Sequence, residues 1–333
     1  FSKTDRETGI EYHEYGTHIF HTSNLKVWEY INKFTEFNNY RHQVLSKHKK
    51  KIYQMPINLE TINSLFNKNF SPKEASVFLK KITKKYKKKS YENFEDKAKS
   101  QIGDKLYSAF IKNYTKKQWK KDPKFLPSSI FNRLPIRLSY NEDYYEQTQW
   151  QGIPKNGYTD IFRNLLKNKN IKVSLNKKYS LNFKIRPKYL TIYTGALDKL
   201  LNYKFGKLDW RSLNFKKKIV NVKDYQGTSV INYPDLNKKY TRIHEPKHLH
   251  PEREVFKKEK TLIIEEYPSN NINEPYYPIN DEKNRNLHRK YKEYLNKRKK
   301  FAFGGRLADY AYYDMDMTIS AALKKFEKIK SKL

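Results

Sequence analysis

Hydrophobic residues recur three and four residues apart in several stretches of the chain, and this spacing predicts amphipathic helices. Ser71-Pro72-Lys73-Glu74 forms a capping box with proline at the first helical position, so one helix is expected to begin there. Ser23 is the expected cap of an earlier helix. The apolar positions of the other predicted helices are Val27, Tyr30, Ile31 and Phe34; Phe94, Ala98, Ile102, Leu106 and Phe110; and Ile319, Leu323, Phe326 and Ile329. Residues 24 to about 120 are therefore expected to be mainly helical.

After Pro123, apolar and polar residues alternate instead, and this pattern predicts short strands in an antiparallel sheet. The expected strands are Asn132–Leu138, Lys218–Val222, Thr228–Tyr233, Thr241–His244 and Thr261–Tyr267. Three other segments are also expected to be extended. Residues 10–22 are expected to contain a turn at Gly16, and Tyr189–Gly195 is expected to be a buried strand. Phe301–Gly305 is expected to lead into a Gly-Gly turn. Gly157–Leu166 is expected to be a helix.

The composition excludes several classes of protein. The 333 residues contain no cysteine, which rules out disulfides, thiolate zinc sites, iron–sulfur clusters and cysteine nucleophiles. No apolar stretch reaches the roughly 18 residues that are needed to cross a bilayer, so no membrane association is expected. Aromatic residues make up 15% of the chain, which is enough for a folded core. The expected location is the cytoplasm.

The formal net charge of +35 makes nucleic acid a candidate partner. Lysine supplies 57 of the 70 basic residues and arginine only 13, and the lysines are spread over every segment. A dedicated nucleic-acid surface concentrates charge on one face and uses arginine for bidentate contacts. A lysine-rich composition is therefore the favoured explanation and no nucleic-acid partner is expected. A basic nucleic-acid-binding protein stays a third hypothesis.

Two histidines, His18 and His21, flank an apolar dipeptide beside the expected turn at Gly16. A pair of metal ligands is one interpretation of this spacing, but residues three apart in an extended segment face opposite sides. No cysteine exists to complete such a site. We therefore expect no metal, and we interpret this segment as backbone that lies against a planar ligand.

Two further patterns point to an anionic ligand. Gly304-Gly305-Arg306 follows a predicted strand and precedes a predicted helix, where glycines allow close approach of a ligand and the helix N-terminus favours pyrophosphate. Arg133 and Arg242 each lie in a strand-like stretch, and two guanidinium groups that face one pocket would suit a diphosphate. An ordinary strand–turn–helix connection and surface salt bridges are the alternatives, and the local sequence leaves them open.

Ten segments of the chain, in this order, resemble those of the UDP-galactopyranose mutase family of flavoenzymes. Between Gly9 and about Leu323 they are HEYGTHIFHTSN, FIKNYTKKQW, NRLPIR, WQGIPKNGYT, IYTGALD, KFGKLDWRSLNF, VINYPD, YTRIHEPKHL, EPYYPIN and GGRLADYAYYDMD. The resemblance implies an isomerase that interconverts UDP-galactopyranose and UDP-galactofuranose. It also implies FAD as the cofactor, which must be reduced so that its N5 forms an adduct with the sugar.

The same resemblance implies roles for individual residues. Arg133 and Arg242 would clamp the diphosphate and, with His21, are the implied catalytic residues. The other implied substrate-binding residues are Tyr114, Trp119, Tyr144, Arg211, Asn232, Tyr277 and Tyr312. The implied cofactor-binding residues are His18, His21, Thr194, Gly195, Gly305, Arg306, Asp314 and Met315.

The implied fold is α/β plus α+β, with an FAD-binding Rossmann-like domain interleaved with a helical domain and an antiparallel β-sheet domain. The expected boundaries are 1–24, 154–202 and 296–333 for the FAD-binding domain, 25–122 for the helical domain, and 123–153 with 203–295 for the sheet domain. The family opens with a strand, a G-x-G-x-x-G turn and a helix, but no two glycines of this chain stand at G-x-G spacing. The resemblance therefore implies that this N-terminal βαβ segment is missing. An inactive or partner-dependent fragment that only binds UDP-sugar is the alternative to an active enzyme, and a homodimer is the expected assembly.

Overall fold

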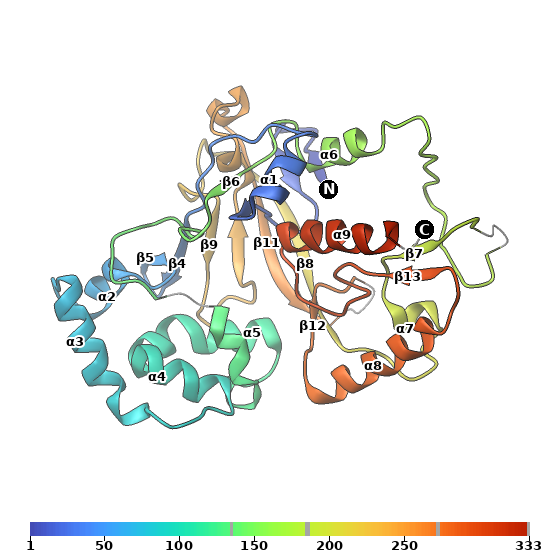
Figure 1. Cartoon of the computed structure of the whole chain (residues 1–333). Helices are drawn as coiled ribbons and strands as arrows, with labels where there is room; N and C mark the ends of the chain where they lie inside the picture. The colour runs from blue at the N-terminus through green and yellow to red at the C-terminus, as the bar shows by residue number, and fades with distance from the viewer. Residues whose placement is uncertain (134–135, 184–186, 271–273, 332–333) are drawn as a thin grey trace. The chain divides into compact units, whose positions relative to one another are not determined.

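The computed structural model describes residues 1–133, 136–183, 187–270 and 274–331, without the side chains of Ser129, Asn132 and Arg133. The chain divides into two compact units, each made from three separate segments (Figure 1). The first unit comprises Phe1–Ile19, Glu36–Thr159 and Asn214–Pro268. The second unit comprises Phe20–Thr35, Asp160–Leu213 and Ser269–Leu333. The expected division into three domains stays a prediction.

A sheet with the strand order β8-β11-β10-β9-β4-β5 forms the centre of the first unit. Its strands are β8 (Trp210–Val220, which begins in the second unit), β11 (Thr261–Ser269), β10 (Arg242–His244), β9 (Val230–Asn232), β4 (Val44–His48) and β5 (Lys51–Met55). Four of the five strands predicted after Pro123 are therefore confirmed. The sheet is mixed rather than antiparallel, because β4 pairs with β9 in parallel. The first unit also contains the paired strands β1 (Ser2–Thr4) and β2 (Glu11–His13), and β6 (Trp150–Gly152).

The helices of the first unit pack against one another and against this sheet around a single core. They are α2 (Leu59–Phe66), α3 (Pro72–Thr83), α4 (Phe94–Leu106) and α5 (Lys112–Trp119), with short 3-10 turns at Lys84–Tyr86, Pro123–Phe125, Ser128–Arg133, Pro246–Leu249 and Glu254–Lys257. The capping box is confirmed, since Ser71 and Glu74 each accept from the other's backbone N–H at the start of α3. The stripe that ends at Phe110 is also confirmed as core, because all five of its residues are buried.

The helical path from α4 to α5 is distorted in two places, one inside α4 and one between the two helices. Gly103 has a φ of +76°, and a Cβ there would lie 2.9 Å from Ile82 Cδ1, so the kink and the close packing of α3 both require glycine. Tyr107–Ile111 forms a π-helical turn (η2). Such turns are frequent at functional sites.

The prediction of a strand at Asn132–Leu138 is wrong for those of its residues that the structure describes. Ser128–Arg133 forms a 3-10 helix (η4), and residues 134–135 lie outside the described part of the chain. The reason is packing onto α4, because Ser128 N–H donates to Glu92 O and the buried Phe131 ring lies edge-on to Phe94 at 5.4 Å. The mainly helical segment 24–120 also contains the β4–β5 hairpin, where the short strand expected at Lys51–Ile57 is confirmed as β5.

The second unit contains the remaining helices and two small strand pairs. Its elements are β3 (Phe20–Thr22), α1 (Leu25–Ile31), α6 (Tyr158–Leu165, which starts in the first unit), β7 (Thr191–Tyr193), α7 (Leu197–Leu200), β12 (Tyr277–Pro278), α8 (Glu282–Asn296), β13 (Phe301–Phe303) and α9 (Met315–Lys330). β7 and β13 are parallel neighbours, and α7 and α8 enclose a core with them that includes Leu197, Tyr291 and Phe303 (Figure 1). No helix of the described chain is long and apolar enough to cross a membrane.

Three local predictions in the second unit need correction. Asn24, not Ser23, caps α1, because the Asn24 side chain accepts from Val27 N–H. β7 is a strand but is not buried, since Ile192 is 55% exposed. The apolar stripe of α9 exists as a pattern, yet no residue of this helix is buried and Phe326 is 56% exposed.

His13 on β2 is buried in the first unit. Its Nδ1 accepts a hydrogen bond of 3.0 Å from the His18 backbone N–H, and its ring meets the edge of Tyr158 at 5.0 Å. Burial, followed by the charge of His18, lowers the pKa of His13 to about 3. The folded protein therefore keeps this imidazole neutral through most of the acidic range.

We expect His13→Asn to make the protein less sensitive to acid. When the unsubstituted protein is unfolded, His13 binds a proton below about pH 6.5. When it is folded, His13 does not do so until about pH 3. The free energy of unfolding should therefore fall by about 1.4 kcal/mol per pH unit as the pH decreases through this window. Asparagine keeps an acceptor for His18 N–H but does not titrate. Urea unfolding of both proteins at pH 7 and pH 5 measures the difference, and equal losses in the two proteins would contradict a neutral His13.

Candidate functional site

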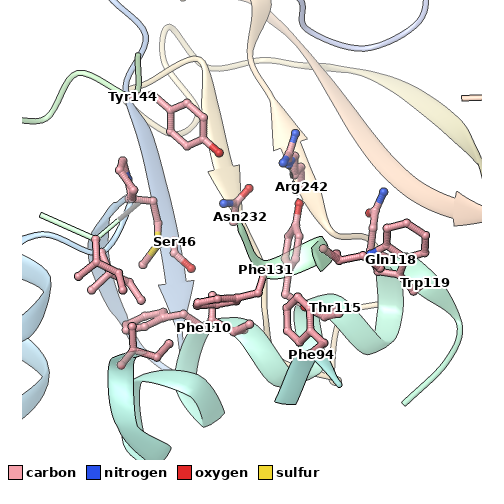
Figure 2. A pocket seen from close by; sticks show the side chains of 18 residues that line it. Ser46, Phe94, Phe110, Thr115, Gln118, Trp119, Phe131, Tyr144, Asn232 and Arg242 are labelled. Carbon is pink, nitrogen blue, oxygen red and sulfur yellow. Dashed lines mark hydrogen bonds between the residues drawn. The ribbon is translucent and has the colours of Figure 1, made fainter. Parts of the chain in front are cut away.

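A pocket in the first unit lies between the sheet and the helices α4 and α5 (Figure 2). Its deep part is apolar and includes Phe94, Phe110 and Phe131, while the sheet side carries polar groups. The lining residues are Ser46, Met55, Pro56, Ile57, Phe94, Ile102, Phe110, Ile111, Tyr114, Thr115, Gln118, Trp119, Ile130, Phe131, Ile136, Tyr144, Asn232 and Arg242. Such a pocket suits a ligand with a flat ring and a polar or anionic part.

Strand pairing aligns the polar groups of the pocket in one row across the sheet. Ser46 of β4 lies opposite Asn232 of β9, Asn232 lies opposite Arg242 of β10, and Arg242 lies opposite Glu266 of β11. Residues opposite one another in neighbouring strands point to the same face of the sheet. The row therefore presents an amide and a guanidinium to one cavity, although these residues are far apart in the sequence.

Arg242 contacts a tyrosine and lies opposite a buried glutamate in the neighbouring strand. Its Nε donates a hydrogen bond of 2.8 Å to the Tyr114 hydroxyl, and its guanidinium carbon lies 5.8 Å from the centre of that ring. Burial raises the pKa of Tyr114 to about 12, although the Arg242 charge opposes this shift. Burial alone would also raise the pKa of Glu266, but the Arg242 charge and bonds from His244 and Thr241 hold it at about 2. Glu266 therefore stays charged at neutral pH, opposite Arg242 in the neighbouring strand.

Helix α5 contributes four residues to the pocket, and the spacing on one helical face explains why. Tyr114, Thr115, Gln118 and Trp119 all line it. Gln118 was not among the residues expected from the sequence, although its position four after Tyr114 places it on the same face. The buried oxygens Gln118 Oε1 and Asn232 Oδ1 have no hydrogen-bond partner among the described residues. Two such acceptors favour a ligand that brings donors into the pocket.

Tyr144 reaches the pocket from the side away from α5 (Figure 2). A buried arginine holds its backbone. Arg137 is 8% exposed and donates to the backbone carbonyls of Asp143 and Tyr144, the latter at 3.1 Å. Its Nε also lies 2.8 Å from Glu146 Oε2, and its own N–H donates to Ile57 O at 3.0 Å. Sequence reasoning missed Arg137 and Glu266, because neither touches the pocket and both act through partners elsewhere in the chain.

Arg133, the expected partner of Arg242, ends the 3-10 helix η4, but its side chain lies outside the described residues. The two-arginine clamp therefore stays a prediction. Five other residues expected to bind the substrate line this cavity, namely Tyr114, Trp119, Tyr144, Asn232 and Arg242, and their roles stay predictions.

A second group of expected residues comes together in the second unit. The rings of Tyr277 and Tyr312 stack at 5.8 Å, and the Arg306 guanidinium carbon lies 4.6 Å from the Tyr312 ring centre. Arg306 also donates to the backbone carbonyls of Tyr313 and Tyr276, which fixes its orientation. Arg211 lies opposite Tyr277 in the β8–β12 pair and donates to Asn270 at 2.7 Å. This arrangement offers aromatic faces and guanidinium charge to an anionic or planar ligand.

Three of the residues expected to bind a cofactor lie at the ends of β7 and β13. Because these strands are parallel, Thr194 and Gly195 after β7 lie beside Gly305 after β13. Gly305 has a φ of +89°, and a Cβ there would lie 3.8 Å from Thr194 Cβ, in the space between the two strand ends. Asp314 is the N-cap of α9 and Met315 its first residue, so backbone N–H groups are also available in this unit. Glycine turns with a helix N-terminus fit the phosphate and ring system of a flavin nucleotide.

The two histidines expected beside the cofactor fall in different units. His18 Nδ1 lies 2.6 Å from Gly16 O in the first unit. His21 belongs to β3 in the second unit, where β3 packs against α9 and Thr22 donates to Asp316 at 3.0 Å. Their shared role beside a planar ligand stays a prediction.

One cluster has the residue types of a metal site, namely Asp224, Glu245 and His248, whose ligand atoms lie within 4.8 Å of one another. The Glu245 oxygens already accept from the N–H groups of residues 225 and 226 and from the Thr261 hydroxyl. Internal hydrogen bonds therefore account for this cluster, and the expectation of no metal stays a prediction.

Comparison with known proteins adds independent information. The GLF family model, described as UDP-galactopyranose mutase, matches residues 109–312. The chain is 38% identical over 99% of its length to a probable UDP-galactopyranose mutase of Klebsiella pneumoniae, and it covers 85% of that protein. It is 36% identical over 97% of its length to a dTDP-fucopyranose mutase of Escherichia coli, with 86% of that protein covered.

Solved structures agree on the fold. A crystal structure of reduced UDP-galactopyranose mutase matches the whole chain with a TM-score of 0.75 at 12% identity, and 87% of that chain is covered. A putative protoporphyrinogen oxidase of Exiguobacterium matches the whole chain with a TM-score of 0.61 at 9% identity, and 90% of that chain is covered.

Proposed function

Since this chain belongs to the UDP-galactopyranose mutase family, whose members are flavin-dependent isomerases, we propose that it interconverts UDP-galactopyranose and UDP-galactofuranose. The observation that carries the proposal is the row formed by Asn232, Arg242 and Glu266 above an aromatic pocket. A guanidinium that donates to the Tyr114 hydroxyl and lies across from a buried negative charge suits a diphosphate, and the aromatic floor suits a uracil ring.

The roles of the individual residues follow from this placement. In the first unit, Arg242 binds the diphosphate, while Tyr114 and Trp119 form the wall for the uridine and sugar. Arg133 is proposed as the second diphosphate arginine. In the second unit, Arg211, Tyr277 and Tyr312 are proposed to contact the substrate through their guanidinium and hydroxyl groups. Asn232 and Tyr144 orient the ligand from the sheet side of the pocket, where both lie.

We propose FAD as the flavin. Thr194, Gly195, Gly305, Arg306, Asp314 and Met315 would hold it, together with His18 and the catalytic residue His21. When bound and reduced, the flavin supplies the nucleophile for the exchange of ring size. The residues of this chain bind and orient the sugar nucleotide and keep the diphosphate charge neutralised while it separates from the sugar. No observation favours the alternative of a fragment that only binds UDP-sugar, and a homodimer and a cytoplasmic location stay predictions.

The proposal is tested by conversion of UDP-galactofuranose by the purified protein after reduction with dithionite, with the products separated by chromatography. The flavin absorption spectrum of the same sample shows whether the cofactor is bound. dTDP-fucopyranose is run in parallel, because a relative of similar identity carries the name of that activity. Bound flavin with conversion of the dTDP sugar alone would overturn the proposed substrate.

We expect Arg137→Met to weaken substrate binding through Tyr144. The substitution removes the donors to the carbonyls of Asp143 and Tyr144, so the turn that carries Tyr144 loses its anchor. The KM should rise by about tenfold, while kcat changes less, because Arg137 itself does not line the pocket. Arg41→Met is the matched control, since Arg41 is more exposed and lies 3.6 Å from Asp143 Oδ2. Equal KM values in both variants would contradict a positioning role of Arg137.

A further inference from the structure

Lys117 of helix α5 is a buried cation beside the pocket. It is 8% exposed, and its Nζ donates to the backbone carbonyls of Tyr233, Asp235, Lys238 and Tyr240. Three of these contacts measure 2.9–3.1 Å, between Nζ and the carbonyls of residues 240, 235 and 238. An ammonium has three N–H donors, so four converging carbonyls satisfy all of them.

All four carbonyls belong to the loop that joins β9 to β10. Asn232 directly precedes this loop, and Arg242 follows it as the first residue of β10. Lys117 itself lies between Tyr114 and Gln118, which both line the pocket. One side chain therefore joins the two walls of the pocket, the helix and the hairpin.

A second link between the same walls is the hydrogen bond from Arg242 to the Tyr114 hydroxyl. That bond joins groups that line the pocket, where a ligand would compete for them. The Lys117 contacts are buried beneath the loop and are independent of any ligand. Burial lowers the pKa of Lys117 to about 8, and the Asp235 charge opposes this shift. The group is therefore charged in most molecules at neutral pH.

The loop also has anchors that are separate from Lys117, since Thr241 N–H donates to Glu266 O at 2.8 Å and the Tyr240 ring meets the edge of Tyr267. The Asp235 carboxylate lies 2.7 Å from His48 Nδ1 and accepts from Lys49 N–H at 2.6 Å, at the turn between β4 and β5. This anchor ties the loop to the sheet and not to α5. Lys117 therefore links α5 to this loop without lining the pocket, and it acts beside the bond from Arg242 to Tyr114.

We propose that Lys117 is a positioning residue that sets the separation of the two pocket walls and so prepares Arg242 and Asn232 for the sugar nucleotide. This rests on the proposed function, because it assigns the pocket to that ligand. The hydrogen bonds described for Lys117 Nζ are all to backbone oxygens. The action of Lys117 therefore does not depend on the side chains of the loop.

The test compares Lys117→Ala with Lys116→Ala. Lys116 is the exposed neighbour on the same helix, so both variants lose one positive charge and one lysine side chain. Amide hydrogen exchange of residues 233–241 is measured without ligand, and UDP affinity is measured by calorimetry. In Lys117→Ala we expect faster exchange in this loop and UDP binding that is about tenfold weaker, whereas Lys116→Ala behaves like the native protein.

Added propylammonium separates positioning from general stability, because it can place an ammonium in the space that the alanine leaves. It should restore loop protection and UDP affinity in Lys117→Ala, whereas tetramethylammonium, which has no N–H donor, should not. If Lys117→Ala does not fold, Lys117→Arg takes its place, because a planar guanidinium cannot satisfy four carbonyls that converge on one point.

The outcomes distinguish the two proposals. Native-like exchange and native-like UDP affinity in the folded Lys117 variant would overturn the positioning role. Loss of loop protection with unchanged UDP affinity would also overturn it, since Lys117 would then be only structural. Failure of the native protein itself to bind UDP would overturn the proposed function, while the exchange data would still decide whether Lys117 orders the loop.

Discussion

Arg242→Met is expected to lower turnover by roughly 10²–10³-fold, which is the cost of removing one well-placed donor to a developing negative charge. Two physical effects combine in this variant. The diphosphate loses a charged donor, and Glu266, which is 3% exposed, loses the charge that balances it. Steady-state rates of sugar conversion measure the effect on catalysis. Urea unfolding measures the accompanying loss of stability, because an unpaired buried carboxylate is strongly destabilising.

Two further variants sharpen this test. Arg242→Lys keeps the charge but not the planar fork, so we expect a smaller loss than in Arg242→Met. Arg289→Met removes an exposed arginine of α8 and should leave turnover unchanged. The flavin spectrum should be the same in all three proteins, because Arg242 lies in the pocket of the first unit and the proposed cofactor glycines lie in the second. Turnover of Arg242→Met close to the native value would refute the assignment of Arg242 to the diphosphate.

Reduction of the bound flavin is the second change with a large expected effect. We expect no measurable conversion of UDP-galactofuranose with oxidised protein and conversion to equilibrium after dithionite, because in the proposed reaction only the reduced flavin would supply the nucleophile. Absorbance at the flavin bands and product formation are followed in the same anaerobic cuvette. Admission of air should oxidise the flavin and stop turnover together.

A matched control separates redox chemistry from binding. Binding of UDP, measured by calorimetry with oxidised and reduced protein, should differ much less than turnover does. Equal rates of conversion in the two redox states would contradict the proposed role of the flavin, whereas absence of flavin from the purified protein would contradict the cofactor assignment.

The parts of the fold that the sequence predicted correctly depend on neighbouring residues. The capping box at Ser71 needs only the side chain three positions later, and the stripe from Phe94 to Phe110 follows from the helical repeat. Gly305 was expected in a turn because glycine tolerates positive φ, and its φ is +89°. The motifs around Tyr114 and Arg242 also identified pocket residues, through resemblance to a known family.

The predictions that failed concern burial and partners, which local patterns do not contain. Asn132–Leu138 alternates like a strand, but its first residues belong to a 3-10 helix whose segment packs on α4. Tyr189–Gly195 is apolar enough for a buried strand, yet Ile192 is half exposed.

The sequence alone determined the helical stripes, most of the strands, the family and the residue types that suit an anionic ligand, because these depend on spacing along the chain or on motifs. Only the tertiary structure decided that Tyr114 meets Arg242 across 128 positions and that Glu266 stands opposite Arg242. It also decided that Lys117 is enclosed by carbonyls of the β9–β10 loop. The physical reason is that hydrogen-bond partners and burial are set by strand register and helix packing, and these join residues that no local pattern connects.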